Sequence, residues 1–345
     1  MASVRTDADP QPSGSRAGAG PVLAVRDLSV AYAMDRGAVL AVDRVSFELY
    51  PGEFLGIVGE SGCGKSTLLF AIAQLLAPPA VIIGGNIVFK GENMVRLTDD
   101  QLTTIRWREL SVVMQSAMNA LNPVKSIGAQ FKDAMKAHGV VSDDEITARS
   151  AEVLRMVGID PIHLKSYPHQ LSGGMRQRSM IAMALLFTPD LVIMDEPTSA
   201  LDVVAQRSLM VHIKALQAEL GFAVVFVTHD MSLVSHFSDR LMVMYAGQVA
   251  EWVATRDVFD TPHHPYSIGL MGAFPSIKGE RVPLTGIPGR PPDLSRRQHG
   301  CWFVPRCPKV MPACRETNPD LYPVRDALVR CLLYAGGADG KAAGD

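Results

Sequence analysis

Length, composition and charge restrict the classes of protein to which this chain can belong. Its 345 residues are enough for two domains of ordinary size, and 48% of them are hydrophobic, which allows a large buried core. The formal net charge of −2 excludes the basic surplus that is typical of nucleic-acid-binding proteins.

The two ends of the chain have a composition typical of flexible tails. Residues 1–20 are rich in alanine, glycine, serine, proline and charge, and 336–345 are similar, so neither buries enough apolar surface to offset its ordering entropy. No apolar run approaches the roughly 20 residues that a membrane-spanning helix needs, and a secretory signal pattern is absent. We therefore expect a cytosolic chain whose membrane partners, if it has any, are other subunits.

Between the tails, short buried runs alternate with amphipathic stretches. Residues 54–58, 191–194 and 223–227 read as buried strands, and 143–157 and 203–220 as helices. Such alternation predicts an α/β fold with a mainly parallel core sheet covered on both faces.

Other segments of the same region depart from this alternation. Residues 22–32 and 45–49 alternate in polarity and predict an antiparallel β edge layer. Residues 116–170 carry few strand signals and predict a helical insertion, with bounds of about 116–187. We expect one nucleotide-binding domain over 21–261. A small, irregular module rich in proline and glycine then covers 262–335.

A phosphate-binding motif follows the first buried strand. Gly59, Gly64, Lys65 and Ser66 occupy the fixed positions of the G-x-x-x-x-G-K-[ST] pattern, at the start of an expected helix. Glycines allow the backbone to close around a phosphate, and the free N–H groups at a helix start attract an anion. The expected nucleotide contacts are Gly59, Ser61, Gly62, Cys63, Gly64, Lys65, Ser66 and Thr67. Lys65 would reach the terminal phosphates and Ser66 would ligate Mg²⁺; Cys63 is interpreted as a small filler residue.

Two acids end the second buried strand, where α/β sheets bind their ligands. We expect Asp195 to join the Mg²⁺ shell and Glu196 to polarise the attacking water. Read alone, the pair could equally cap the turn that begins at Pro197. His229 follows the third buried strand and is a candidate for a γ-phosphate contact.

A second glycine pair precedes an expected helix in the segment 171–177, Leu-Ser-Gly-Gly-Met-Arg-Gln. It resembles the signature motif of ABC ATPases, written LSGGQ, with Met175 at the glutamine position. The Met-Arg-Gln-Arg variant resembles the oligopeptide/dipeptide (peptide/nickel) importer branch. The resemblance covers roughly residues 22–335 and implies that Ser172, Gly173 and Gly174 contact a nucleotide.

Further motifs of that family occur in the expected order. Tyr32 matches the aromatic residue that stacks on adenine, Gln115 the Mg²⁺-sensing Q-loop glutamine, Asp202 the D-loop acid, and His229 the switch histidine. The resemblance assigns catalytic roles to Glu196, His229 and Gln115.

The resemblance also implies a mechanism and partners. Two such domains dimerise head to tail and enclose ATP between the phosphate loop of one and the signature helix of the other. Because the chain has one phosphate loop, a second ABC ATPase chain is required, and we expect a heterodimer. Two transmembrane permease subunits and an extracytoplasmic substrate-binding protein would complete a peptide importer at the cytoplasmic face of the membrane.

Four cysteines lie in the C-terminal module: Cys301, Cys307, Cys314 and Cys331. Four thiolates can hold Zn²⁺ or a [4Fe–4S] cluster, and their spacing matches neither a zinc ribbon nor a common ferredoxin pattern. Four structural thiols without metal are a further interpretation. The segment 263–266, His-His-Pro-Tyr, resembles the C-terminal extension of peptide-importer ATPases, and similar tails carry an iron–sulfur cluster, so the resemblance favours iron.

Three alternatives keep parts of this interpretation. The same motor could serve nickel, glutathione or another small solute. A non-transport ABC ATPase would usually carry a second cassette, a long coiled coil or a basic insertion, and this sequence has none of them. A P-loop kinase would leave the signature segment unexplained.

Overall fold

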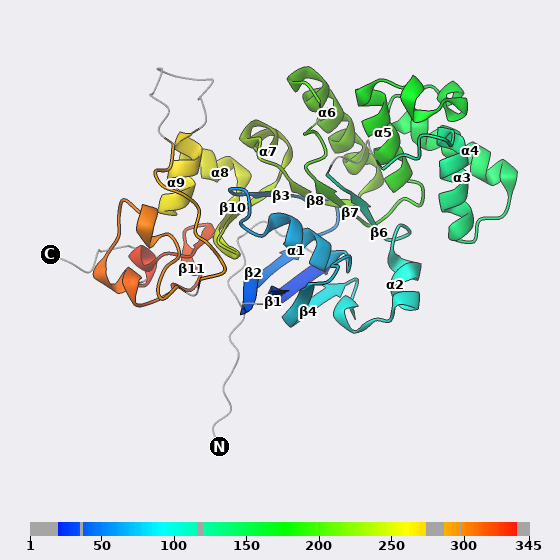
Figure 1. Ribbon diagram of the computed structural model, residues 1–345. Coiled ribbons are helices and arrows are strands. Elements are labelled where there is room, and N and C mark those ends of the chain that lie inside the picture. Colours follow the sequence, from blue (N-terminus) through cyan, green and yellow to red (C-terminus); the bar gives the residue numbers. More distant parts are fainter. Residues whose placement is uncertain are drawn as a thin grey trace.

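The computed structural model describes residues 20–34, 37–115, 120–199, 201–273, 286–296 and 298–336 (Figure 1). The expected tails lie outside this part of the chain, except for Gly20 and Gly336 at their borders. So do residues 116–119, where we expected the helical insertion to begin, and a stretch of the C-terminal module, 274–285.

The predicted parallel sheet forms the centre of the described structure. Its strands are β3 (Phe54–Val58), β6 (Leu110–Val113), β7 (Leu191–Asp195), β8 (Ala223–Val227), β9 (Arg240–Tyr245), β10 (Gln248–Ala254), β11 (Tyr322–Val324) and β12 (Ala327–Val329). They pair in the order β11-β12-β10-β9-β3-β8-β7-β6, and the five from β9 to β6 run parallel. Every residue of β3, β7 and β8 is buried, which confirms the three strands expected from apolar runs.

The expected antiparallel layer is a separate sheet. It contains β1 (Leu23–Met34), β2 (Gly37–Leu49), β4 (Ala80–Phe89) and β5 (Glu92–Asn93), in the order β2-β1-β4-β5. The sequence indicated β1 and the end of β2 but not β4. Helix α1 (Lys65–Ile72) lies between the two sheets, and its Leu68, Leu69 and Ile72 are fully buried in the core that joins them.

Helices cover the central sheet. They are α2 (Asp99–Ile105), α3 (Ile127–Ala137), α4 (Asp143–Met156), α5 (Gly173–Ala184), α6 (Val203–Leu220), α7 (Met231–Phe237), α8 (Thr255–Asp260) and α9 (Pro265–Gly272). Three of those described, α3, α4 and α5, lie within the expected helical part at 116–187. Short 3-10 turns occur at Met94–Arg96, Pro161–Lys165, Pro168–Gln170, Val304–Arg306, Pro312–Arg315 and Leu332–Tyr334. Local chemistry sets the helix ends: Ser142 caps α4 by accepting from Glu145 N–H at 3.3 Å, and α6 ends at Gly221 with φ of 77°.

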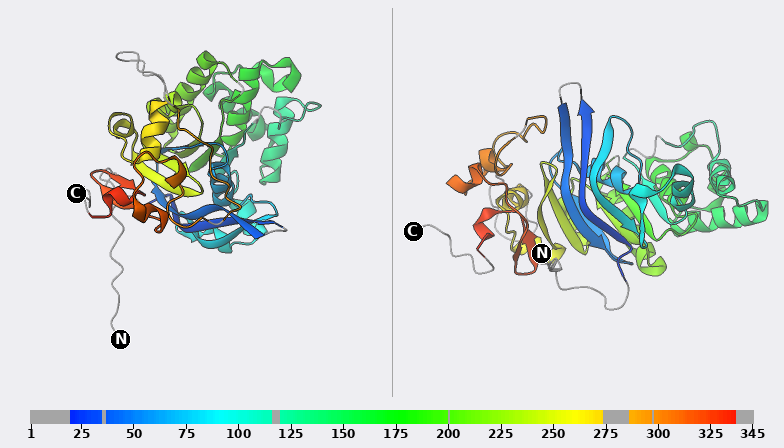
Figure 2. Two further views of the ribbon diagram at one scale, coloured as in Figure 1. Left: turned by 60° about the vertical axis from the view of Figure 1, so that its left-hand side comes forward. Right: turned by 90° about the horizontal axis from the view of Figure 1, so that it is seen from below.

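The C-terminal module is less irregular than we expected. Its hairpin β11–β12 pairs with β10 through Glu251↔Val329 and Trp252↔Leu328, so the module continues the central sheet. Strands of three residues, one of them containing Pro323, are too short for a periodicity to reveal. Figure 2 shows this module, in orange and red, on the opposite side of the molecule from the green helical part. Within the described residues, no helix combines the length and apolarity needed to cross a bilayer.

Candidate nucleotide site and four-cysteine pocket

The loop between β3 and α1 has a backbone that only glycine can adopt at two of its fixed positions. Gly59 has φ of 150° and Gly64 has φ of 102°. A Cβ atom at Gly64 would lie 2.1 Å from the Ala41 carbonyl oxygen, and one at Gly59 would lie 2.3 Å from that of Met244. The turn therefore requires both glycines for conformation and for space.

Lys65 turns back over this loop. Its Nζ donates to the carbonyl oxygens of Gly59 at 2.7 Å and Glu60 at 2.9 Å, which holds the ammonium above the hollow of the loop. Cys63 lies beneath it, with Sγ 3.7 Å from Lys65 Nζ, and burial raises the pKa of the Cys63 thiol. A buried, protonated thiol agrees with the filler interpretation. On the other side of the helix start, the Tyr32 hydroxyl lies 3.0 Å from Thr67 Oγ1.

The acidic end of β7 meets the phosphate loop. Ser66 Oγ donates to Asp195 Oδ1 at 3.2 Å, although the two residues are 129 positions apart. Asp195 is 2% exposed, and burial is the main reason why the pKa of its carboxyl is raised, with Glu196 adding to the effect. A hydroxyl and a buried carboxylate placed together at a phosphate loop form a donor set that suits Mg²⁺.

Glu196 lies beside both of the other predicted catalytic residues. Gln115 Nε2 donates to its Oε2 at 2.7 Å, and His229 Nδ1 lies 3.5 Å from its Oε1. Its φ of 46° is uncommon for a residue other than glycine, and its N–H donates to the Val227 carbonyl at 2.9 Å. The His229 side chain is 70% exposed, so this edge of the site is open.

The glycine pair of α5 is not part of this cluster. Ser172 caps α5 by accepting from Met175 N–H at 3.3 Å, and Gly173 and Gly174 form the first turn. Helix α5 lies apart from α1 (Figure 1), although Gln177 Nε2 donates to the Pro197 carbonyl just after the acidic pair. Asp202 caps α6 by accepting from Ala205 N–H at 2.9 Å. Within one chain, the Ser172 turn and Asp202 therefore make local contacts, as the caps of their own helices.

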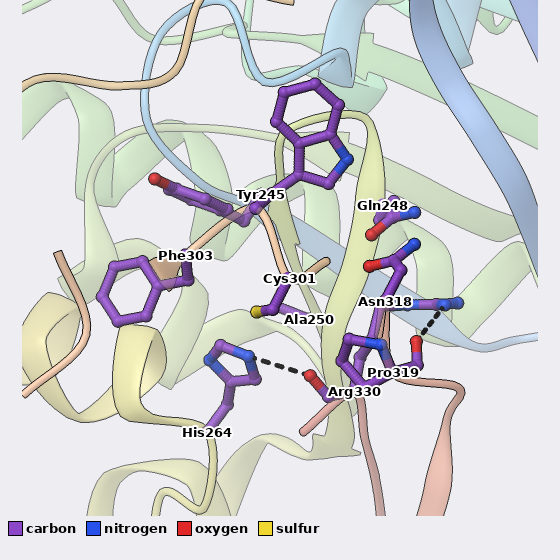
Figure 3. Close-up of a pocket in the computed structure, with 10 residues that line it drawn as sticks. Tyr245, Gln248, Ala250, His264, Cys301, Phe303, Asn318, Pro319 and Arg330 are labelled. Atoms are coloured by element: carbon purple, nitrogen blue, oxygen red, sulfur yellow. Dashed lines mark hydrogen bonds between the residues drawn. The ribbon is translucent and has the colours of Figure 1, made fainter. Parts of the chain in front are cut away.

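The four C-terminal cysteines line one pocket. All four are free thiols, and they share the cavity with His264 and Phe303. Figure 3 shows the neighbouring pocket, where Cys301 lies among Phe303, His264 and Ala250. Burial raises the pKa of Cys301 and Cys307, and that of Cys331 to about 11.

The fit of this pocket to a metal group is partial. In the described part of the chain, no group of three or more cysteine, histidine or carboxylate side chains is arranged to hold a metal ion. The four thiols thus have the right chemistry and a common cavity but not a ligating geometry, so the iron–sulfur cluster expected from the resemblance stays a prediction.

Three residues beside the nucleotide site were missed by sequence reasoning. Arg306 forms a bidentate ion pair with Glu60, and Tyr266 accepts a hydrogen bond from Glu60 N–H. Glu60 occupies a variable position of the phosphate motif, and its partners are more than 200 residues away, so no local pattern could indicate the contacts. The one signal was the segment 263–266, to which we assigned no chemistry.

Two parts of the chain match known protein families. Residues 42–199 match the ABC transporter family, and residues 250–314 match the oligopeptide/dipeptide transporter C-terminal region. The chain is 43% identical over 300 residues to the oligopeptide transport ATP-binding protein OppD of Salmonella typhimurium, covering 86% of this chain and 89% of that protein. It is 44% identical over 301 residues to the dipeptide transport ATP-binding protein DppD of Bacillus subtilis, covering 86% and 90%.

Solved structures resemble the same region. One is the dimeric post-hydrolysis state of the ATP-binding cassette MJ0796 bound to ADP and phosphate, with a TM-score of 0.61 and 31% identity over 68% of this chain and 99% of that one. Another is cbiO1 from Clostridium perfringens, part of an ABC transporter complex, with a TM-score of 0.60 and 28% identity over 70% and 91%. The fold is therefore that of an ABC ATPase, a P-loop NTPase of the α/β class, as the sequence predicted.

Proposed function

The chain belongs to the ABC transporter ATP-binding subunits of the oligopeptide/dipeptide importer family, and on that premise we propose how its residues divide the work of ATP hydrolysis. It is the ATPase subunit of a peptide ABC importer. The observation that carries the proposal is the Ser66–Asp195 hydrogen bond of 3.2 Å, because it joins the phosphate loop to the acidic strand end.

The phosphate loop binds the nucleotide in this proposal. Backbone N–H groups of the residues from Gly59 to Thr67 would bind the β-phosphate, and the dipole of α1, which begins at Lys65, would add to the attraction. Lys65 exchanges its two loop carbonyls for phosphate oxygens when ATP arrives. Tyr32, beside Thr67, offers a ring to the adenine.

The acidic strand end activates water. Ser66, Asp195 and Gln115 would hold Mg²⁺, which neutralises charge on the β- and γ-phosphates. Glu196 accepts a proton from the attacking water, with Gln115 and His229 fixing the direction of its carboxylate. The two neighbouring acids have different partners, since Asp195 accepts from Ser66 whereas Glu196 accepts from Gln115 and lies beside His229, so they serve different tasks.

A second ATPase chain completes the site. Ser172, Gly173 and Gly174 would contact the γ-phosphate of ATP held by the partner, and Asp202 would lie near the same boundary. The exposed edge at His229 and the exposed start of α6, where Val203 and Val204 are 77% and 80% exposed, support an interface there. We propose a heterodimer bound to two permease subunits at the cytoplasmic face, served by an extracytoplasmic substrate-binding protein.

Domain limits and the metal group complete the proposal. The ATPase domain covers 21–261, with its helical part at 116–187, and the C-terminal module covers 262–335. Cys301, Cys307, Cys314 and Cys331 would hold a [4Fe–4S] cluster that stabilises the module. A shared cavity and four free thiols support this assignment. The thiols would have to move closer to one another to ligate a cluster, because they are not arranged as a metal site here.

The test is transport by the assembled importer. The chain is co-expressed with its permease and ATPase partners, reconstituted into vesicles, and assayed for ATP hydrolysis and uptake of labelled di- and oligopeptides. Peptide-stimulated hydrolysis supports the proposal. If the subunits copurify and the vesicles take up nickel or glutathione but no peptide, the proposed cargo is wrong, whereas the assignment as a transport ATPase stands.

A further inference from the structure

A partly buried ion pair connects the four-cysteine module to the phosphate loop. Arg306 Nη1 donates to Glu60 Oε2 at 2.6 Å and Nη2 donates to Oε1 at 2.8 Å. Arg306 immediately precedes Cys307, and Glu60 immediately follows Gly59. The two side chains are only 3% and 25% exposed, so water screens the pair weakly.

Arg306 is held independently of the phosphate loop, by the module and by Tyr245 of β9. Nε donates to the Pro288 carbonyl at 2.9 Å, and the guanidinium lies 5.9 Å from the Tyr245 ring centroid. Gly289, with φ of 82°, leaves just enough room, since a Cβ there would lie 3.3 Å from Arg306 Cγ. The arginine is therefore a fixed donor to which Glu60 is attached.

A second contact holds the main chain of the same residue. Glu60 N–H donates to Tyr266 Oη at 2.9 Å, and Tyr266 is fully buried. Its ring centroid lies 4.6 Å from that of Tyr245 and 5.6 Å from that of Phe303, which lines the four-cysteine pocket. Because Lys65 Nζ donates to the Glu60 carbonyl oxygen, the contacts that fix Glu60 also help to hold the Lys65 ammonium at the loop.

We propose that Arg306 is a positioning residue for the phosphate loop, and that through it the four-cysteine module sets the affinity of the loop for nucleotide. The idea rests on the proposed function. Two physical effects act in the same direction. Arg306 restrains the loop, and it neutralises a carboxylate that would otherwise repel the incoming phosphates.

Removing the positive charge of Arg306 should weaken nucleotide binding. Arg306→Met leaves Glu60 unpaired, and we expect the Kd of a fluorescent ATP analogue to rise about tenfold. Glu60→Gln combined with Arg306→Met should bind more tightly than Arg306→Met alone, because the repulsive charge is gone. Arg306→Lys, which retains the charge but lacks the fork, should fall between wild type and Arg306→Met.

The matched control is Arg296→Met. Arg296 lies in the same module, is 86% exposed and pairs with Asp293 at 3.4 Å, so its removal should leave the Kd unchanged. If thermal unfolding shows that Arg306→Met does not fold, the Kd values of Arg306→Lys and Glu60→Gln are compared with that of wild type instead. Binding by Arg306→Met within about twofold of wild type, or a double variant weaker than both single ones, would overturn the role of Arg306.

A second cycle tests the link to the cysteines. Cys307→Ser should weaken nucleotide binding in the wild-type background and have no further effect in Arg306→Met, with iron content measured in parallel. Equal weakening in both backgrounds would refute coupling through Arg306. A wild-type importer without ATPase activity would refute the proposed function instead, and these binding comparisons would be unaffected.

Discussion

Gln115 and Glu196 are joined by a hydrogen bond of 2.7 Å, from Nε2 to Oε2, across 81 positions of sequence. The other carboxylate oxygen of Glu196 lies 3.5 Å from His229 Nδ1. Three elements of the central sheet thus fix one acid, since Gln115 follows β6, Glu196 follows β7 and His229 follows β8. A base held on both sides can orient a water molecule without first reorganising.

Replacing Glu196 by glutamine preserves its shape and removes its charge. We expect Glu196→Gln to bind ATP as tightly as wild type and to hydrolyse it at least about 100-fold more slowly. Equilibrium binding and single-turnover hydrolysis separate the two effects. Glu109→Gln, at an exposed acid paired with Lys90, is the control and should hydrolyse normally. Near-normal turnover by Glu196→Gln would remove this residue from the role of base.

Burial of the Asp195 carboxylate destabilises the folded protein, and a bound Mg²⁺ ion would offset this effect. Without Mg²⁺, Asp195→Asn should unfold at the same temperature as wild type or higher, because it removes a charge that is 2% exposed. In the folded protein the pKa of Asp195 is raised above the ordinary 3.8. As the pH falls through this raised pKa, Asp195 becomes protonated and neutral, so the difference in unfolding temperature between wild type and Asp195→Asn should shrink. Thermal unfolding in EDTA between pH 4 and 8 measures this.

The same variant tests the magnesium role. Mg²⁺ raises the ATP affinity of wild type by some factor, and in Asp195→Asn that factor should be smaller by at least about tenfold. Asp190→Asn, at an exposed acid near the other end of the same strand, should retain that gain. An undiminished Mg²⁺ effect in Asp195→Asn would exclude this carboxylate from the metal shell.

Two glycines should respond differently to alanine. At Gly64, the positive φ and the Ala41 carbonyl oppose a side chain, so Gly64→Ala should abolish nucleotide binding and lower stability by about 1–3 kcal/mol. At Gly174 an added Cβ meets nothing within 4 Å, so Gly174→Ala should leave stability and nucleotide binding by the single chain intact. It should nevertheless reduce hydrolysis by the assembled transporter. Weaker binding by the isolated Gly174→Ala chain would show that the turn acts on its own phosphate loop.

Local sequence patterns predicted the elements that depend on local chemistry. The strands of 54–58 and 223–227 and the helix of 203–220 have the expected limits, because apolar runs and caps such as Asp202 define them. The order of the sheet, with β3 between β8 and β9, is a tertiary property that no run of residues contains. The Arg306–Glu60 pair escaped prediction for the same reason, since the final packing alone brings its halves together.

The metal content of the C-terminal module can be measured directly. We expect protein purified without oxygen to contain iron and acid-labile sulfide in equal amounts, and Cys314→Ser to lose both. Cys63→Ser is the matched control, since Cys63 is buried in the phosphate loop away from the four-cysteine pocket and should leave the iron in place. Colourless protein with stoichiometric zinc would refute the cluster, and metal-free protein of normal stability would favour four structural thiols.

The composite nucleotide site is the claim on which the mechanism depends. It is tested most directly by determining the structure of the complete transporter carrying Glu196→Gln with ATP and Mg²⁺ bound. We predict that the N–H groups of Gly173 and Gly174 and the hydroxyl of Ser172 contact the γ-phosphate of ATP in the phosphate loop of the partner ATPase. An ATP-loaded complex in which this turn lies far from every phosphate would contradict the account.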